Sequence, residues 1–169
     1  MVAHPRSLVL CLATAALLLA AAPLLAAPAA APLRVETRAA ATTGPCIPSS
    51  TVLCIDNQTG DQRFEISVTF STRQSGGHSG NGQAIALASV GVTHGGLFWF
   101  FSQDNPEVLV KVLDGCPFNS RFWVFLSAAT NVGFTVTVRD TVTANENLYI
   151  NHDLNAAGPL EDTNAFMCP

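Results

Sequence analysis

Three closely spaced apolar segments dominate the middle of the chain. They are Leu97–Phe101 (LFWFF), Val108–Leu113 (VLVKVL) and Arg121–Leu126 (RFWVFL), with Asn, Asp, Gly and Pro in the breaks between them. In the first and third segments, large apolar side chains occupy both alternating faces, which is typical of strands in the middle of a covered sheet. The pattern therefore predicts three neighbouring β-strands with packing on each side.

Two other segments alternate between apolar and polar residues. In Arg63–Thr72 (RFEISVTFST) every second residue from Phe64 to Phe70 is apolar, and Asn131–Val138 (NVGFTVTV) has a similar pattern. A period of two predicts strands with one buried face and one solvated face, and it assigns Arg63 to the solvated face. Shorter strands are predicted at Thr51–Ile55, Gln83–Ala88 and Leu148–Ile150.

Turn residues separate all these segments, and no stretch has the period of an amphipathic helix. Arg73–Gly82 (RQSGGHSGNG) contains four glycines and is expected to be a flexible loop. The sequence thus predicts an all-β domain: an antiparallel β-sandwich or a partly open barrel of about eight strands.

The first part of the chain has the layout of a secretory signal peptide. Arg6 precedes an apolar run, Leu8–Ala22, and small residues and prolines follow. The run is shorter than the ~20 apolar residues of a spanning helix, so an uncleaved anchor is the weaker alternative. We expect a signal peptide at 1–31, a flexible linker at 32–45 and a single β-sandwich domain at 46–169. The mature chain is expected to be secreted or periplasmic, without a transmembrane segment.

Cysteine usage agrees with export. Besides Cys11 in the leader, the chain has Cys46, Cys54, Cys116 and Cys168. An even number in a small exported domain predicts two disulfides, and no C-x₂-C spacing favours a metal site instead. Three pairings are open, of which we favour Cys46–Cys54 with Cys116–Cys168 by a slight margin.

The charge balance disfavours some partners. The chain has 12 acidic and 8 basic residues, a net charge of −4, and an acidic chain without a basic patch argues against nucleic acid and anionic membrane surfaces as partners. Its only lysine, Lys111, shares a predicted strand face with Leu109 and Leu113. We expect a carboxylate from a neighbouring strand, or an opening to solvent, to satisfy this lysine.

Acidic turn residues suggest one metal alternative. Asp104, Asn105 and Glu107 lie in one predicted turn, and Asp114 begins the next. Calcium binds six to eight oxygen ligands, and such loops could supply them. Because Asp and Asn are also the residues that turns prefer, no cofactor is predicted and calcium is kept as the alternative.

Aromatic residues are the best candidates for ligand contacts. Trp99, Trp123 and Tyr149 could stack on sugar rings if exposed, although their place in apolar strands favours the core. A glycan or a cell-envelope protein is therefore the expected partner. Two loop histidines, His78 and His94, support the alternative of an extracellular hydrolase or a hydrolase inhibitor.

Several segments together carry a resemblance to a known family. They are C-x-P-S…T-x-L-C (Cys46–Cys54), RF-x-[IV]-x-V (Arg63–Val68), G-x-FWFFS-x-DN (Gly96–Asn105), E-x-x-VKVLDGC (Glu107–Cys116), N-x-R-[FY]-WVF (Asn119–Phe125), V-x-[FY]-T-V-x-V-x-DT (Val132–Thr141) and DT-x-AF (Asp162–Phe166). The chain resembles a family of small exported bacterial β-rich domains of unassigned function. This resemblance implies an exported β-rich module and transfers no catalytic or binding residue. Together with the absence of a catalytic motif, it favours a non-catalytic module for adhesion, glycan binding or structure at the cell exterior.

Overall fold

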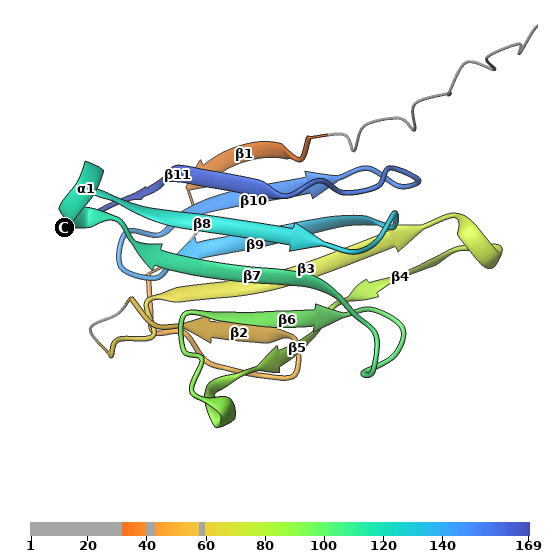
Figure 1. Cartoon of the computed structure of the whole chain (residues 1–169), viewed down its shortest axis with the longest axis horizontal. Helices are drawn as coiled ribbons and strands as arrows, with labels where there is room; N and C mark the ends of the chain where they lie inside the picture. The colour runs from red at the N-terminus through yellow and green to blue at the C-terminus, as the bar shows by residue number, and fades with distance from the viewer. Residues whose placement is uncertain (1–31, 40–42, 58–59) are drawn as a thin grey trace, which may run out of the picture.

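The computed structural model describes residues 32–39, 43–57 and 60–169, and the predicted signal peptide lies outside them. The described residues form two antiparallel sheets that face each other, without a closed barrel (Figure 1). In the order of their pairing, sheet I consists of β1 (Arg34–Ala39), β10 (Asn145–Asn151), β9 (Gly133–Asp140), β3 (Phe64–Thr72) and β2 (Val52–Ile55), with β4 (His78–Asn81) also paired to β3. Sheet II consists of β11 (Leu160–Met167), β8 (Arg121–Ala128), β7 (Pro106–Asp114), β6 (Gly95–Trp99) and β5 (Gln83–Ala86). The predicted all-β sandwich is confirmed.

Within residues 32–39, 43–57 and 60–169, helical structure is limited to three short segments. They are η1 (Gln74–Gly76), η2 (Ala88–Val90) and α1 (Cys116–Asn119). In the part of the chain that the structure describes, no helix has the length and apolar character needed to cross a membrane.

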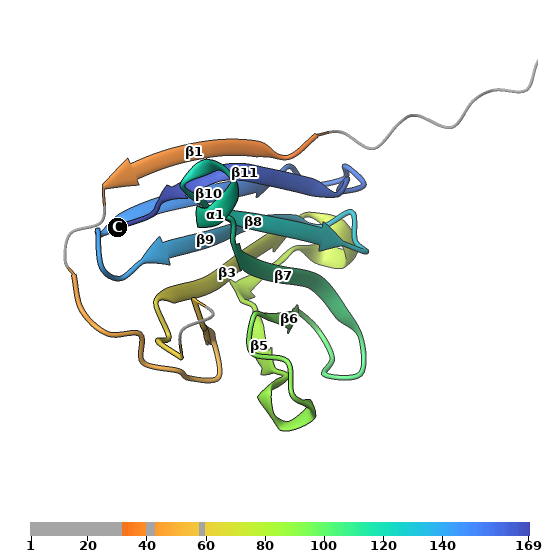
Figure 2. The same ribbon diagram turned by 60° about the vertical axis from the view of Figure 1, so that its left-hand side comes forward.

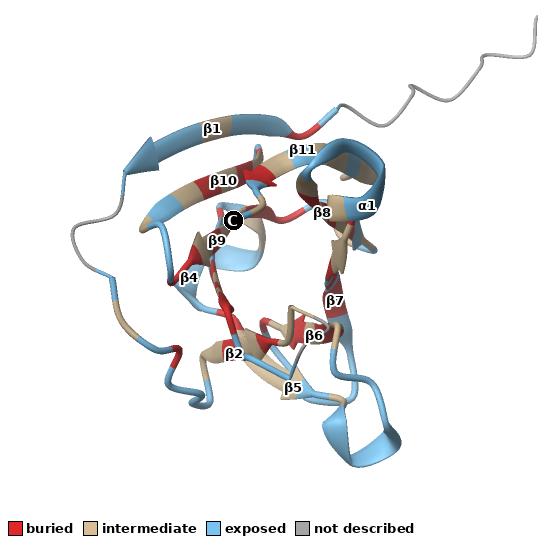
Figure 3. Ribbon diagram, turned by 90° about the vertical axis from the view of Figure 1, so that its left-hand side faces the viewer, coloured by how far each residue is buried: buried red, intermediate tan, exposed pale blue. Residues whose placement is uncertain are grey.

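The core lies between the two sheets, and the buried residues belong to strands of both (Figure 3). Because side chains alternate along a strand, every second residue of β3, β7, β8 and β9 points inward. At one end of the core, the Phe64 ring of β3 lies 5.0 Å from the Phe122 ring of β8 and 5.6 Å from the Phe166 ring of β11. These aromatic contacts join sheet I to sheet II.

Both disulfides have the pairing that the sequence favoured. Cys46–Cys54 connects the segment before β2 to β2 itself, and Cys116–Cys168 connects α1 to the end of the chain. The second disulfide therefore fixes α1 and the segment after β11 at one end of sheet II.

The prediction of a flexible linker at 32–45 is wrong for its first half. Arg34–Ala39 forms β1, which pairs in register with β10 at the edge of sheet I (Figure 2). Nearly every β1 side chain is exposed, so the strand is attached mainly by its backbone ladder, while Leu33 before it is buried in the core. Backbone hydrogen bonding between strands does not require apolar side chains, so the hydrophobic pattern of the sequence could not predict β1.

Two other expectations need correction. The glycine-rich segment predicted to be a flexible loop contains β4, which pairs with the end of β3. Arg63, predicted to face solvent, is buried, and its guanidinium binds the Asp140 carboxylate through two hydrogen bonds, Nε–Oδ1 2.8 Å and Nη2–Oδ2 2.6 Å. Because Arg63 precedes the paired part of β3, the alternation of that strand does not determine its direction.

Candidate binding surface on sheet II

The outer face of sheet II is apolar, and no described element covers it (Figure 1). Since Val108, Val110 and Val112 point into the core, the intervening residues of β7 point outward. The same alternation brings side chains from β6 and β8 to this face. Its apolar members, with Ile85 of β5, are Leu97, Trp99, Leu109, Leu113, Trp123 and Phe125, all at least partly exposed. We call this surface the outer face.

Both tryptophans lie on the outer face and not in the core. Trp99 and Trp123 are each partly exposed, whereas their neighbours Phe98 and Phe122 are buried. The core interpretation of the two indoles was therefore wrong. Sheet II is buried on one side only, so the second apolar face of β6 and β8 meets solvent.

Three aromatic rings from α1 and β8 gather at one end of the outer face. The Trp123 ring lies 5.4 Å from the Phe118 ring and 6.4 Å from the Phe125 ring. Phe118, on α1, is 78% exposed. We call Phe118, Trp123 and Phe125 the Trp123 cluster. Exposed aromatic faces of this kind suit an apolar or ring-shaped ligand.

The Trp123 ring is held in place by its neighbours. Its Nε1–H donates a 2.9 Å hydrogen bond to Oδ1 of Asn119, whose Nδ2 donates to the Thr163 carbonyl at 2.8 Å. The ring also lies directly against Gly115, where an added Cβ would collide with the indole atoms Cε2 and Nε1. The Cys116–Cys168 disulfide anchors this turn, so the indole is fixed before any ligand arrives.

Lys111 is the basic member of the outer face. Lys111 stands opposite Phe125 in the β7–β8 register, and its Nζ lies 4.7 Å from the Phe125 ring centre. Within the described residues, no carboxylate is within ion-pair distance of this ammonium group. The expected cross-strand carboxylate partner is thus not present there, and solvent with the Phe125 ring satisfies the charge.

Trp99 belongs to the opposite end of the outer face. It pairs with Pro106 at the start of β7, whereas Trp123 pairs with Leu113 near its end. Seven residues of strand separate the two positions, about 24 Å at the usual rise. The two tryptophans would therefore contact a ligand at two separate places.

Tyr149, the third aromatic candidate, has no exposed surface. It is 0% exposed, and its hydroxyl donates a 2.9 Å hydrogen bond to Oδ2 of Asp162, which joins β10 to β11. Burial raises the pKa of Tyr149, and the negative charge of Asp162 raises it further. Tyr149 therefore connects the two sheets and cannot stack on a ligand.

The buried phenol predicts an unusual alkaline titration. Tyr149 is the only tyrosine, so tyrosinate absorbance reports on it alone. We expect no ionisation near the ordinary pKa of about 10 while the chain is folded. Because folding favours the neutral phenol, its contribution to stability is complete below pH ~10 and is lost as the pH rises further. Tyrosinate absorbance that increased near pH 10 without loss of the circular dichroism signal would contradict the burial.

The four candidate metal ligands do not come together. The Asn105 Nδ2 donates to Glu107 Oε1 at 3.1 Å, and Asp104 accepts a hydrogen bond from Ser102. Asp114 lies at the other end of β7, about 24 Å from Glu107 along the strand.

Glu107 and Asp114 differ in their surroundings. Glu107 is 6% exposed, and burial raises the pKa of its carboxyl although the Phe100 backbone N–H opposes the rise.

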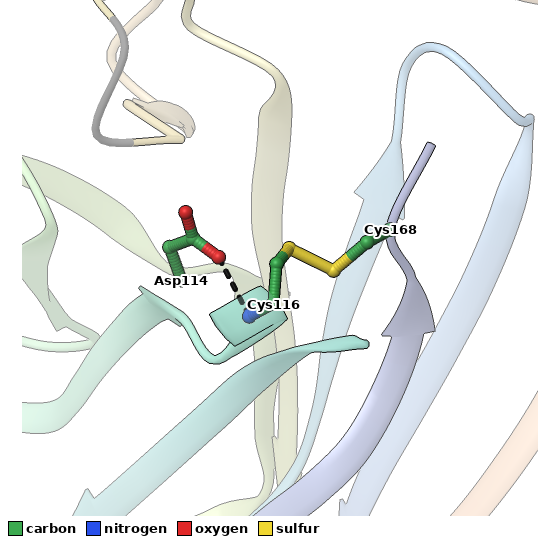
Figure 4. A group of neighbouring side chains, drawn as sticks. All are labelled: Asp114, Cys116 and Cys168. Atoms are coloured by element: carbon green, nitrogen blue, oxygen red, sulfur yellow. Dashed lines mark hydrogen bonds between the residues drawn. A yellow bond between two sulfur atoms is a disulfide. The ribbon is translucent and has the colours of Figure 1, made fainter. Parts of the chain in front are cut away.

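Among the described residues, the one group of three possible ligand side chains is Asp114, Cys116 and Cys168 (Figure 4). Its two sulfurs form the disulfide, and Asp114 Oδ1 accepts a hydrogen bond from the Cys116 backbone N–H at 2.7 Å. That group is structural, since metal binding would need free thiolates.

His78 and His94 lie at opposite ends of the sandwich. His78 pairs with Thr72, the last residue of β3. His94 lies beside Asp56, which follows Ile55, and Ile55 pairs with Phe64, the first residue of β3. Thr72 and Phe64 are eight positions apart along β3, about 27 Å at the usual rise per residue. The two imidazoles cannot act on one substrate bond.

An open pocket of about 870 Å³ lies where the edge of β2 approaches β5. Its described lining contains no histidine or lysine, and its arginine, Arg63, is bound by Asp140. The lining also includes the carboxylates of Asp56 and Asp61, and Asp56 Oδ1 accepts a hydrogen bond from the Gly60 backbone N–H at 2.9 Å.

In comparisons with known proteins, no protein-family model, no curated protein and no solved structure matches this chain.

Proposed function

We propose that the chain is an exported, non-catalytic binding module that attaches to glycan or protein of the cell exterior through the outer face of sheet II. The observation that carries this proposal is the uncovered apolar face with the fixed Trp123 cluster at one end. Contiguous exposed apolar surface usually marks an interaction site, and tryptophan is among the residues that most often dominate binding energy.

Export is supported by the leader sequence and by the two disulfides, which persist in oxidising compartments. The resemblance to small exported β-rich domains supports the same localisation. The hydrolase alternative, by contrast, gains no support from the separated histidines or from the lining of the open pocket.

Replacing Trp123 by Ala should abolish retention on cell-envelope material and leave the chain folded. Loss of a tryptophan that dominates an interface typically lowers affinity more than tenfold. The measurement is a pull-down of purified protein on isolated envelope, with circular dichroism to establish that the variant is folded.

Phe101→Ala is the matched control, because Phe101 is also an exposed aromatic (49%) but packs against Phe70 and His78 away from the outer face. We expect this variant to bind like the native chain. Equal retention of the native and Trp123→Ala chains, or measurable turnover of a substrate without binding, would refute the proposed function.

A further inference from the structure

We propose that the Trp123 end of the outer face binds an acidic polysaccharide, with one sugar ring stacked on the Trp123 cluster and a sugar carboxylate bound by Lys111. This inference rests on the proposed function, because it assigns a ligand class to the same surface. Uronic acids, which carry a carboxylate on a pyranose ring, have the required chemistry.

The aromatic part of the site is rigid, with the planes of the Phe118 and Trp123 rings inclined by 36°. Trp123 packs on Gly115 and is bound by Asn119, while the exposed Phe118 extends the apolar surface beside it. A pyranose ring presents C–H groups on its faces, which an aromatic ring accommodates without loss of hydrogen bonds. Because the indole is already fixed, stacking costs little conformational entropy.

Lys111 supplies the complementary charge. Its ammonium lies 4.7 Å from the Phe125 ring, which is itself 6.4 Å from the Trp123 ring. A chain stacked on Trp123 would therefore bring the substituents of an adjoining ring to the ammonium. Since no described carboxylate pairs with Lys111, a ligand carboxylate would have no internal competitor to displace.

The position of Lys111 also disfavours the simplest other occupant, a second copy of the chain. β7 is the central strand of sheet II, and Lys111 lies in its middle. A symmetric pairing of two outer faces about an axis at Lys111 would bring the two ammonium groups close together, and like charges in an interface are unfavourable. An anionic ligand turns the same charge into an attraction.

Glu161 provides an internal control on the other side of Phe125. It pairs with Phe125 in the β8–β11 register, is exposed, and points to the same face. Lys111 and Glu161 thus lie on the strands either side of β8, about 10 Å apart. Glu161 would repel an anionic ligand, whereas Lys111 would attract it.

The test measures binding of a short oligogalacturonate by titration calorimetry, beside the same oligomer with its carboxylates methyl-esterified. We expect Lys111→Met, which keeps the apolar stem over Phe125, to weaken oligogalacturonate binding about tenfold. Lys111→Arg should retain binding, and Glu161→Gln should strengthen it. Added salt should weaken binding of the charged oligomer and leave that of the ester unchanged.

The outcomes separate this inference from the proposed function. Equal binding of the acid and the ester, or equal binding by the native and Lys111→Met chains, would overturn the acidic ligand and leave a binding module in place. Self-association through the outer face, seen as a Trp123-dependent dimer, would also overturn it. Binding of envelope material that survives Trp123→Ala would remove both proposals.

Discussion

Replacing Arg63 by Ala should lower the free energy of unfolding by about 3–5 kcal/mol, because it leaves a buried carboxylate without its partner. Arg63 and Asp140 are both buried and share two hydrogen bonds. The Arg63 guanidinium also lies 4.6 Å from the Phe122 ring of the opposite sheet. One side chain therefore neutralises Asp140 and packs across the core. Urea denaturation followed by tryptophan fluorescence would give the value.

Arg139→Ala is the control for this prediction. Arg139 pairs with Glu65 on the solvent side of the same two strands, with Nη2 and Oε2 2.6 Å apart, and both side chains are partly exposed. Partly exposed pairs contribute about 1 kcal/mol or less. Similar losses for the two variants would mean that burial of the Arg63 pair has no energetic consequence.

The same pair predicts how stability depends on pH. Burial alone would raise the pKa of Asp140, but hydrogen bonds from Arg63, Thr143 and the Val142 backbone N–H outweigh it and lower the pKa. A carboxyl with a lowered folded pKa stabilises the protein above its unfolded pKa, about 3.9, and this contribution is lost as the pH falls below that value. The native chain should therefore lose stability on acidification below pH ~4 more steeply than Arg63→Ala.

Removing the Cys116–Cys168 disulfide should destabilise the chain more than removing Cys46–Cys54. The two bridges span sequence separations of 52 and 8 residues. Loop-closure entropy in the unfolded chain then gives about 4 kcal/mol for the longer loop and about 2.5 kcal/mol for the shorter one. Paired Cys→Ala replacements, each measured by thermal unfolding, would test this order.

Loss of the longer disulfide should also loosen the binding surface. Cys116 begins α1, which carries Phe118 and the Asn119 that binds the Trp123 indole. We therefore expect weaker envelope binding by Cys116→Ala/Cys168→Ala at temperatures where the variant is still folded. The Cys46→Ala/Cys54→Ala variant, altered at the other disulfide, should bind normally. The reverse order of stabilities, or unchanged binding by the first variant, would contradict this role.

The sequence predicted the fold where side chains alternate and failed where backbone pairing decides. Phe64 to Phe70 determined the inward face of β3, because only one of its faces is apolar. β1 and β4 are mostly exposed on both faces and are held by ladders to β10 and β3, so their side chains carried no signal.

The candidate site was only partly predictable for a different reason. In β6 and β8 both faces are apolar, so parity could not decide whether Phe or Trp points inward. The structure places Phe98 and Phe122 inside and both tryptophans outside. Phe118 was missed because it lies in a turn. The one available signal was an aromatic residue beside Pro117, within a segment of turn-forming residues.

The most direct test of the outer face as the binding surface is an NMR titration that follows indole and phenyl signals. The chain has two tryptophans, so two indole N–H signals report on the two ends of the outer face. With soluble fragments of cell-envelope polysaccharide, the signals of Trp123, Phe118 and Phe125 should shift first, while those of His78 and His94 stay unchanged. Shifts confined to the histidine loops or to the pocket beside β2, with Trp123 unaffected, would contradict the account.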